Sequence, residues 1–128
     1  MTSPSRVLMI GLATDAVDFE KWPELSPEKL EAALLAVERD LRAAGYDARW
    51  CLTDRGETAL EQVGAALEEV RPHVVLVGAG VRKDPEHLLL FEQILNAVLE
   101  RAPGARLAFN TLPFDSVEAV ARWSPPTR

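Results

Sequence analysis

The sequence predicts an α/β domain in which four short strands alternate with four helices and build one parallel sheet. Four apolar runs of strand length are each followed by a segment with helical character, an order typical of parallel strands joined by helical crossovers. The runs 6–12 and 73–78 are almost entirely apolar, which is typical of strands buried on both faces. The run 46–52 alternates between apolar and polar residues and the run 107–110 is short, so both are predicted edge strands.

The strand order follows from these positions. With right-handed crossovers they predict the order 2-1-3-4, a flavodoxin-like or Rossmann-like three-layer sandwich that lacks a fifth strand. This order places the second and third helices on one face of the sheet and the first and last on the other. The 128 residues, 48% hydrophobic and 27% charged, are typical of one globular α/β domain covering residues 1–128.

Each predicted helix begins at a recognisable start signal. Ser26 and Asp84 each precede a proline and a glutamate, which combines an N-cap, a proline at the first helical position and an acid in the first turn. Thr58 and Glu61 match a capping box. The predicted helical segments are 27–45, 58–70, 84–101 and 115–123.

Charge and apolar patterning limit the partners of the chain. A net charge of −6 and a pI of about 4.9 disfavour nucleic acid, since phosphate neutralisation needs a basic surface. No stretch approaches the roughly 20 apolar residues of a membrane span, and no signal-peptide core precedes the first strand. A single cysteine, Cys51, fits a reducing compartment. We therefore expect a cytoplasmic protein with neither a membrane nor a nucleic-acid partner.

The fold predicts where a ligand would bind. Open parallel sheets bind ligands at the carboxyl ends of their strands, where the strand order reverses, here between the first and third strands. Two glycines after the third strand would let backbone amides approach an anion, and the next two residues are cations suited to phosphate or carboxylate. The candidate residues for a small anionic ligand are Gly11, Gly78, Gly80, Arg82, Lys83, Asn110 and Thr111.

A structural interpretation of the same residues remains open. The Gly-Ala-Gly segment lacks the third glycine of a dinucleotide fingerprint, and no P-loop lysine follows it. Asp84 would compete for helix amides and repel an anion. The glycines would then only shape a tight turn, and the two cations would be solvated.

Other titratable residues support no assigned chemistry. Asp15, Asp18 and Glu20 read as a solvated acidic loop, because nothing in the sequence fixes their geometry. His87 would be suited to general-base work, although an exposed surface histidine is the commoner case. Together with His73 and one cysteine it makes no zinc site. The acids of a phospho-accepting receiver and the hydroxyl-rich loop of a flavodoxin are absent, so we assign no catalytic residue, metal or cofactor.

Several runs resemble those of a family of small bacterial α/β proteins to which no activity is assigned. The likeness covers nearly the whole chain and implies a bacterial source and a compact α/β domain, but it transfers no site residues. It is carried by the runs "WCLTDRGETA", "VVLVGAGVR", "LLLFEQILNAV", "AFNTLPFDS" and "AVARW".

The third helix predicts self-association. Its apolar residues cover an arc of about 180°, wider than the stripe a surface helix needs, so part of the helix is expected to face a second copy in a homodimer. In the alternative, the last helix and the proline-rich tail 124–128 cover the apolar surface of a monomer. Two functions therefore remain open, binding of a small anion and a non-catalytic homo-oligomeric interaction module. The apolar residues are Leu88, Leu89, Leu90, Phe91, Ile94, Leu95, Val98 and Leu99.

Overall fold

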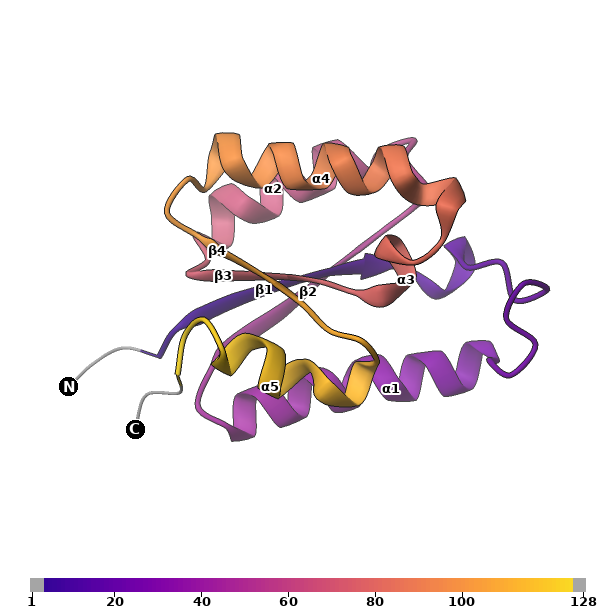
Figure 1. Ribbon diagram of the computed structural model, residues 1–128, viewed down its shortest axis with the longest axis horizontal. Coiled ribbons are helices and arrows are strands. Elements are labelled where there is room, and N and C mark those ends of the chain that lie inside the picture. The colour runs from indigo at the N-terminus through magenta and orange to yellow at the C-terminus, as the bar shows by residue number, and fades with distance from the viewer. Residues whose placement is uncertain (1–3, 126–128) are drawn as a thin grey trace.

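A four-stranded parallel sheet forms the centre of the molecule (Figure 1). The computed structural model describes residues 4–125, apart from the side chain of Pro113, so the end of the predicted tail, 126–128, lies outside the described residues. All three strand pairs are parallel and the order is β2-β1-β3-β4, which confirms the predicted fold class. The strands are β1 (Arg6–Leu12), β2 (Asp47–Thr53), β3 (Val74–Val77) and β4 (Arg106–Phe109).

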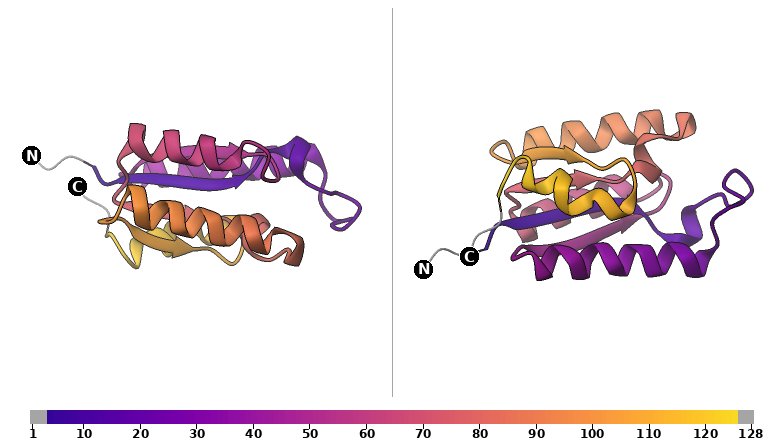
Figure 2. Two further views of the ribbon diagram at one scale, coloured as in Figure 1. Left: turned by 90° about the horizontal axis from the view of Figure 1, so that it is seen from above. Right: turned by 60° about the horizontal axis from the view of Figure 1, so that its bottom comes forward.

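Helices cover both faces of the sheet, as Figures 1 and 2 show. The helices α2 (Ala59–Val70) and α4 (Leu88–Arg101) pack side by side on one face. The helices α1 (Pro27–Ala43) and α5 (Ser116–Ala121) cover the other face, as the strand order predicts. Four short elements complete the chain: η1 (Thr14–Ala16), α3 (Ala79–Arg82), η2 (Pro85–His87) and η3 (Pro113–Asp115).

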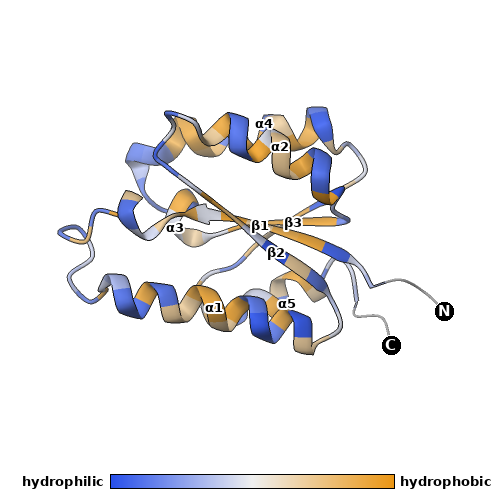
Figure 3. Cartoon of the chain, turned by 180° about the vertical axis from the view of Figure 1, so that it is seen from behind, coloured by the Kyte–Doolittle hydropathy of each residue, from blue (hydrophilic) through white to orange (hydrophobic). Residues whose placement is uncertain are grey.

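The core lies on both sides of β1 and β3. Val7 and Met9 are buried beneath α1 and α5, whereas Leu8 and Ile10 are buried beneath α2 and α4. Figure 3 shows this hydrophobic character along β1 and β3 and its alternation with polar residues on α1. Burial of apolar surface on two faces explains why these strands occupy the centre.

The alternating strand β2 lies at an edge of the sheet, as predicted. Ala48 and Trp50 face α1, and the indole Nε1 of Trp50 donates a hydrogen bond to the carbonyl of Leu34, 2.8 Å away. Cys51 faces the opposite core and is buried. Burial raises the pKa of the Cys51 thiol, which keeps it protonated and poorly nucleophilic.

Two helix starts differ in detail from the prediction. Thr58 does not act as a side-chain cap, because its hydroxyl donates to Asp54, 2.6 Å away, in a turn that precedes α2. Asp84 does act as a cap and accepts a hydrogen bond from the amide of Glu86, but it opens the 3₁₀ turn η2 before α4 begins. The predicted glycine loop after β3 is partly helical and forms α3.

Candidate functional site

The switch point lies where the sequence places it. The strands β1 and β3 are direct neighbours, and the amide of Gly78 donates a 2.9 Å hydrogen bond to the carbonyl of Ile10. The segments that follow the two strands therefore emerge at one edge, which we call the carboxyl edge. The long loop before α1 projects from this same end of the molecule (Figure 1).

Gly11 makes room for a core side chain at this edge. A Cβ atom at its position would come within 3.2 Å of Cζ3 of Trp50. Glycine therefore lets the Trp50 ring lie against β1, and this contact accounts for Gly11 without a ligand.

The two glycines after β3 differ in their surroundings. Neither has a positive φ, so neither uses the left-handed conformation that favours glycine. Gly78 is buried and precedes α3, with φ −69°. Gly80 is exposed, and beyond its own helical turn no described atom lies within 4 Å of the place its Cβ would take. Open space beside α3 is what a ligand approaching its backbone would need.

Asn110 joins α3 to α5 from within the protein. Its Oδ1 accepts a hydrogen bond from the amide of Ala79 at 3.0 Å, and its Nδ2 lies 3.0 Å from the hydroxyl of Ser116. Only 4% of the Asn110 surface is exposed. The side chain predicted to orient a ligand thus holds the first amide of α3 and the first turn of α5.

The two predicted cations reach from α3 to the segment after β4. Arg82 donates through Nη2 to the carbonyl of Asn110, and its guanidinium lies 5.9 Å from the ring centroid of Phe109, in cation–π range. Lys83 donates through Nζ to the carbonyl of Thr111, 2.8 Å away. The structure therefore brings together the predicted residues of the segments 78–83 and 110–111, whereas Gly11 packs against Trp50.

Thr111 is engaged by a carboxylate of its own loop. Its amide and its hydroxyl both donate to Asp115. Burial would raise the pKa of the Asp115 carboxyl, but the hydrogen bonds from Thr111 and Leu112 outweigh it and lower this pKa. Asp115 therefore stays ionised and closes the loop between β4 and α5.

Sequence reasoning missed a partly buried polar cluster at the start of α4. The ammonium of Lys21 lies 2.8 Å from Glu86 and 3.4 Å from Asp84, and so ties the long loop to η2. The amide of Glu86 and then Lys21 lower the pKa of the Asp84 carboxyl. His87 is buried rather than exposed, with Nδ1 3.9 Å from Asp84, too far for a hydrogen bond. No local pattern signals this cluster, because Lys21 is distant in sequence.

An acidic hollow lies at the β2 side of the carboxyl edge. It has a volume of about 310 Å³ and is lined by Asp15, Ala16, Asp54, Arg55 and Glu57. Arg55 donates through Nε to the carbonyl of Ala16 at 2.6 Å, and Asp54 binds the Thr58 amide and hydroxyl. Within residues 4–125, no group of three histidine, cysteine or acidic side chains has the geometry to hold a metal ion.

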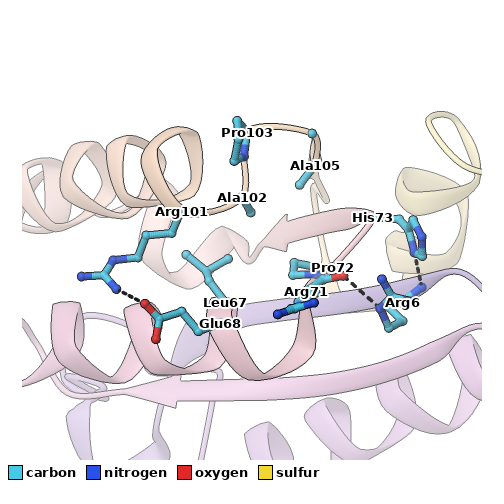
Figure 4. A pocket seen from close by; sticks show the side chains of 11 residues that line it. Arg6, Leu67, Glu68, Arg71, Pro72, His73, Arg101, Ala102, Pro103 and Ala105 are labelled. Carbon is cyan, nitrogen blue, oxygen red and sulfur yellow. Dashed lines mark hydrogen bonds and ion pairs between the residues drawn. The ribbon is translucent and has the colours of Figure 1, made fainter.

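A larger cavity of about 610 Å³ lies at the opposite end of the sheet, which we call the amino edge (Figure 4). It lies where α2 and α4 end and β1 begins. Sequence reasoning placed His73 away from the ligand edge and did not consider the arginines around it. The lining residues are Arg6, Leu67, Glu68, Arg71, Pro72, His73, Arg101, Ala102, Pro103, Gly104 and Ala105.

The sheet therefore has a candidate site at each end, with Arg82 and Lys83 at the carboxyl edge and an arginine-lined cavity at the amino edge. Among the described helices, none is long and apolar enough to cross a membrane. Comparisons of the chain with models of protein families, with curated proteins and with solved structures find no match.

Proposed function

We propose that the protein binds a small anion at the carboxyl edge, over the segment 78–83. The observation that carries the proposal is that Arg82 and Lys83 are both anchored beside the switch point by carbonyls of the segment after β4. The net charge of the protein is −6, so two adjacent cations at the common ligand edge of this fold are a local exception. Anchored cations need little reordering when they bind a phosphate or a carboxylate.

The position of Asp84 removes one objection to this proposal. Its carboxylate caps η2 and lies against Lys21, which offsets its charge. It therefore competes for the amides of η2 and not for those of α3. Gly80 leaves the approach to α3 open.

Replacing Lys83 by glutamine is expected to weaken the binding of inorganic phosphate, pyrophosphate or citrate about tenfold, since one charge-assisted hydrogen bond is lost. Lys83 is exposed and donates one hydrogen bond to a carbonyl, so the variant should fold as the wild type does. Binding is measured as the ligand-induced rise in melting temperature at low ionic strength.

Arg39→Gln is the matched control, because it removes one positive charge from an exposed side chain in the C-terminal half of α1. Its response to the three anions should equal that of the wild type. Gly80→Leu fills the open space beside α3 and should also reduce the response. A wild-type protein that none of the anions stabilises, or equal responses in Lys83→Gln and Arg39→Gln, would refute the proposal.

A specific observation favours a second function, self-association through α4. Three leucines of this helix are strongly exposed: Leu88 at 59%, Leu89 at 65% and Leu99 at 61%. Leu88 and Leu99 lie about three helical turns apart, so they share one face. Phe91 of the same helix packs edge-on against Phe109 of the edge strand β4, with ring centroids 5.9 Å apart. We propose that this outer face of α4 packs against its copy about a twofold axis.

The proposed dimer predicts a mass of two chains in sedimentation equilibrium at micromolar concentration. Leu88→Glu and Leu99→Glu together should shift the protein to the mass of one chain, because four carboxylates would meet across the twofold axis. Both positions are exposed in the single chain, so the two substitutions should not destabilise the folded monomer. The melting temperature should fall only by the amount that dimer formation had added. A wild-type mass of one chain at about 100 µM would exclude this dimer.

A further inference from the structure

We infer that the amino-edge cavity is a second binding site and that it takes a small organic anion, with a carboxylate or phosphate head on an apolar body. The cavity is distinct from the carboxyl edge, and the inference does not depend on the function proposed there. Its volume of about 610 Å³ falls in the range of sites that bind small molecules. Its lining combines apolar residues with positive charge from Arg6 and Arg71 at one end, whereas Arg101 at the other end is paired with Glu68 (Figure 4).

The cationic lining outweighs the acidic one. Arg6, Arg71 and Arg101 line the cavity with a single acid, Glu68, which Arg101 binds at 2.6 Å. Screening over about 8 Å at physiological salt makes this local excess matter more than the net charge of the whole chain. Guanidinium groups bind carboxylate and phosphate through paired hydrogen bonds, so an anion is the ligand that this set fits.

The carbonyls at the ends of the two helices do not reverse this preference. A helix C-terminus carries partial negative charge, which disfavours an anion. At α2 this charge is already engaged, because Nε of Arg6 donates to the carbonyls of Val70 and Arg71 at 3.0 and 2.9 Å. The end of α4 lies beside Arg101, whose guanidinium lies over the bare α-carbon of Gly64.

His73 contributes a further donor. Its Nδ1 accepts a 2.9 Å hydrogen bond from the amide of Arg6, and its own amide donates to the carbonyl of Arg6. The proton of the neutral ring therefore resides on Nε2, which becomes a hydrogen-bond donor. In Figure 4 this ring lies at the same end of the cavity as Arg6 and Arg71.

The backbone of Arg71 supplies an independent observation. Among the described residues it is the only non-glycine residue with a positive φ, 49°, in the left-handed conformation that ends α2. Glycine is the usual residue at such a position, and any residue with a Cβ is held there at a cost. An arginine that lines a cavity from a strained position is consistent with a role for its side chain in binding.

The floor of the cavity determines the body of the ligand. Its accessible apolar surface belongs to Ala102, Pro103 and Ala105, because Leu67 and Pro72 are buried. An aromatic ring or a short alkyl chain that covers this surface would bind favourably, because apolar surface is removed from water. An inorganic anion would leave it in water, so we expect an aryl or alkyl carboxylate or phosphate monoester to bind better than inorganic phosphate.

The test titrates the full chain with four small molecules and monitors binding through the ¹H–¹⁵N NMR shifts of its amides. Benzoate and phenyl phosphate carry both the head and the body, inorganic phosphate carries only the head, and benzamide carries the body without charge. Benzoate and phenyl phosphate should shift the amides of residues 67–73 and 101–105 and bind at least tenfold more tightly than the other two. Preference between the two acids then identifies carboxylate or phosphate as the natural head.

Two variants of Arg71 test whether its positive charge is needed for benzoate binding. Arg71→Gly should lose at least tenfold in affinity for benzoate while its melting temperature without ligand is not lowered, because glycine relieves the left-handed conformation. Arg71→Lys keeps both the charge and the strain and should lose no more than about threefold. Arg39→Gln should bind benzoate as the wild type does.

Three results would overturn the inference. Benzamide binding as tight as that of benzoate would mean that the site does not recognise anions. Equal benzoate affinity in wild type and Arg71→Gly would remove the arginine from the site. Amide shifts confined to residues 78–83 and 110–111 would assign the binding to the carboxyl edge instead.

Discussion

Replacing Ile10 by alanine is expected to lower the free energy of unfolding by about 3–5 kcal/mol. Ile10 has no exposed surface and lies in the middle of the sheet, where its neighbours in register are Cys51 of β2 and Val77 of β3. Helices cover both faces of the sheet, so the cavity left by the lost atoms cannot fill with water or close without moving the backbone. Domains are stable by about 5–15 kcal/mol, so this one change removes a large part of the total.

Urea denaturation at neutral pH measures this loss, and Leu52→Ala is the matched control. Leu52 lies in the edge strand β2 and is exposed, so its replacement should cost less than about 1 kcal/mol. Equal losses in the two variants would mean that β1 is not a central strand of the sheet.

The sequence predicts the sheet well because burial leaves a direct mark on strands. Val7 and Met9 face one helical layer and Leu8 and Ile10 face the other, so β1 has to be apolar at every position. Trp50 and Cys51 of β2 also face opposite layers, but Arg49, the residue before Trp50, is exposed at the edge. Strand order follows from this difference together with the handedness of crossovers.

The partners of the candidate site residues could not be predicted in the same way. Whether Arg82 binds a solute or the carbonyl of Asn110 depends on the path of the segment after β4, which no local pattern encodes. The same holds for Lys21, whose contact with Asp84 depends on how the long loop folds back. Side-chain hydrogen bonds between distant segments are decided by tertiary packing.

The amino-edge cavity has a different origin. It arises where α2 and α4 end beside the start of β1, and its charge comes from Arg6, Arg71 and Arg101 in three separate segments. The only local signal was the Arg71-Pro72 pair, which marks a helix end but not its left-handed conformation. The rule that ligands of open parallel sheets bind at the switch point predicts a site at the carboxyl edge and does not predict this cavity.

Replacing Asn110 by alanine is expected to cost about 2–3 kcal/mol and to release the start of α3. The variant loses the hydrogen bond from the Ala79 amide and the contact with the Ser116 hydroxyl. Each hydrogen bond contributes about 1 kcal/mol, and a partly buried amide left without a partner adds a further penalty. The bond from Arg82 to the backbone carbonyl of Asn110 does not need the side chain, so the C-terminal end of α3 should stay in place.

Urea denaturation gives the energetic loss, and NMR shifts of residues 78–82 report the release of α3. The matched control is Asn96→Ala, in which an exposed asparagine of α4 loses only its bond to the carbonyl of Glu92. Alanine favours the helix there, so the change should stay within about 0.5 kcal/mol of zero. If Asn110→Ala is no more damaging than Asn96→Ala, then the amide does not position α3. Anion binding at the carboxyl edge would then depend on Arg82 and Lys83 alone. The rise in melting temperature that phosphate produces in Asn110→Ala would test this.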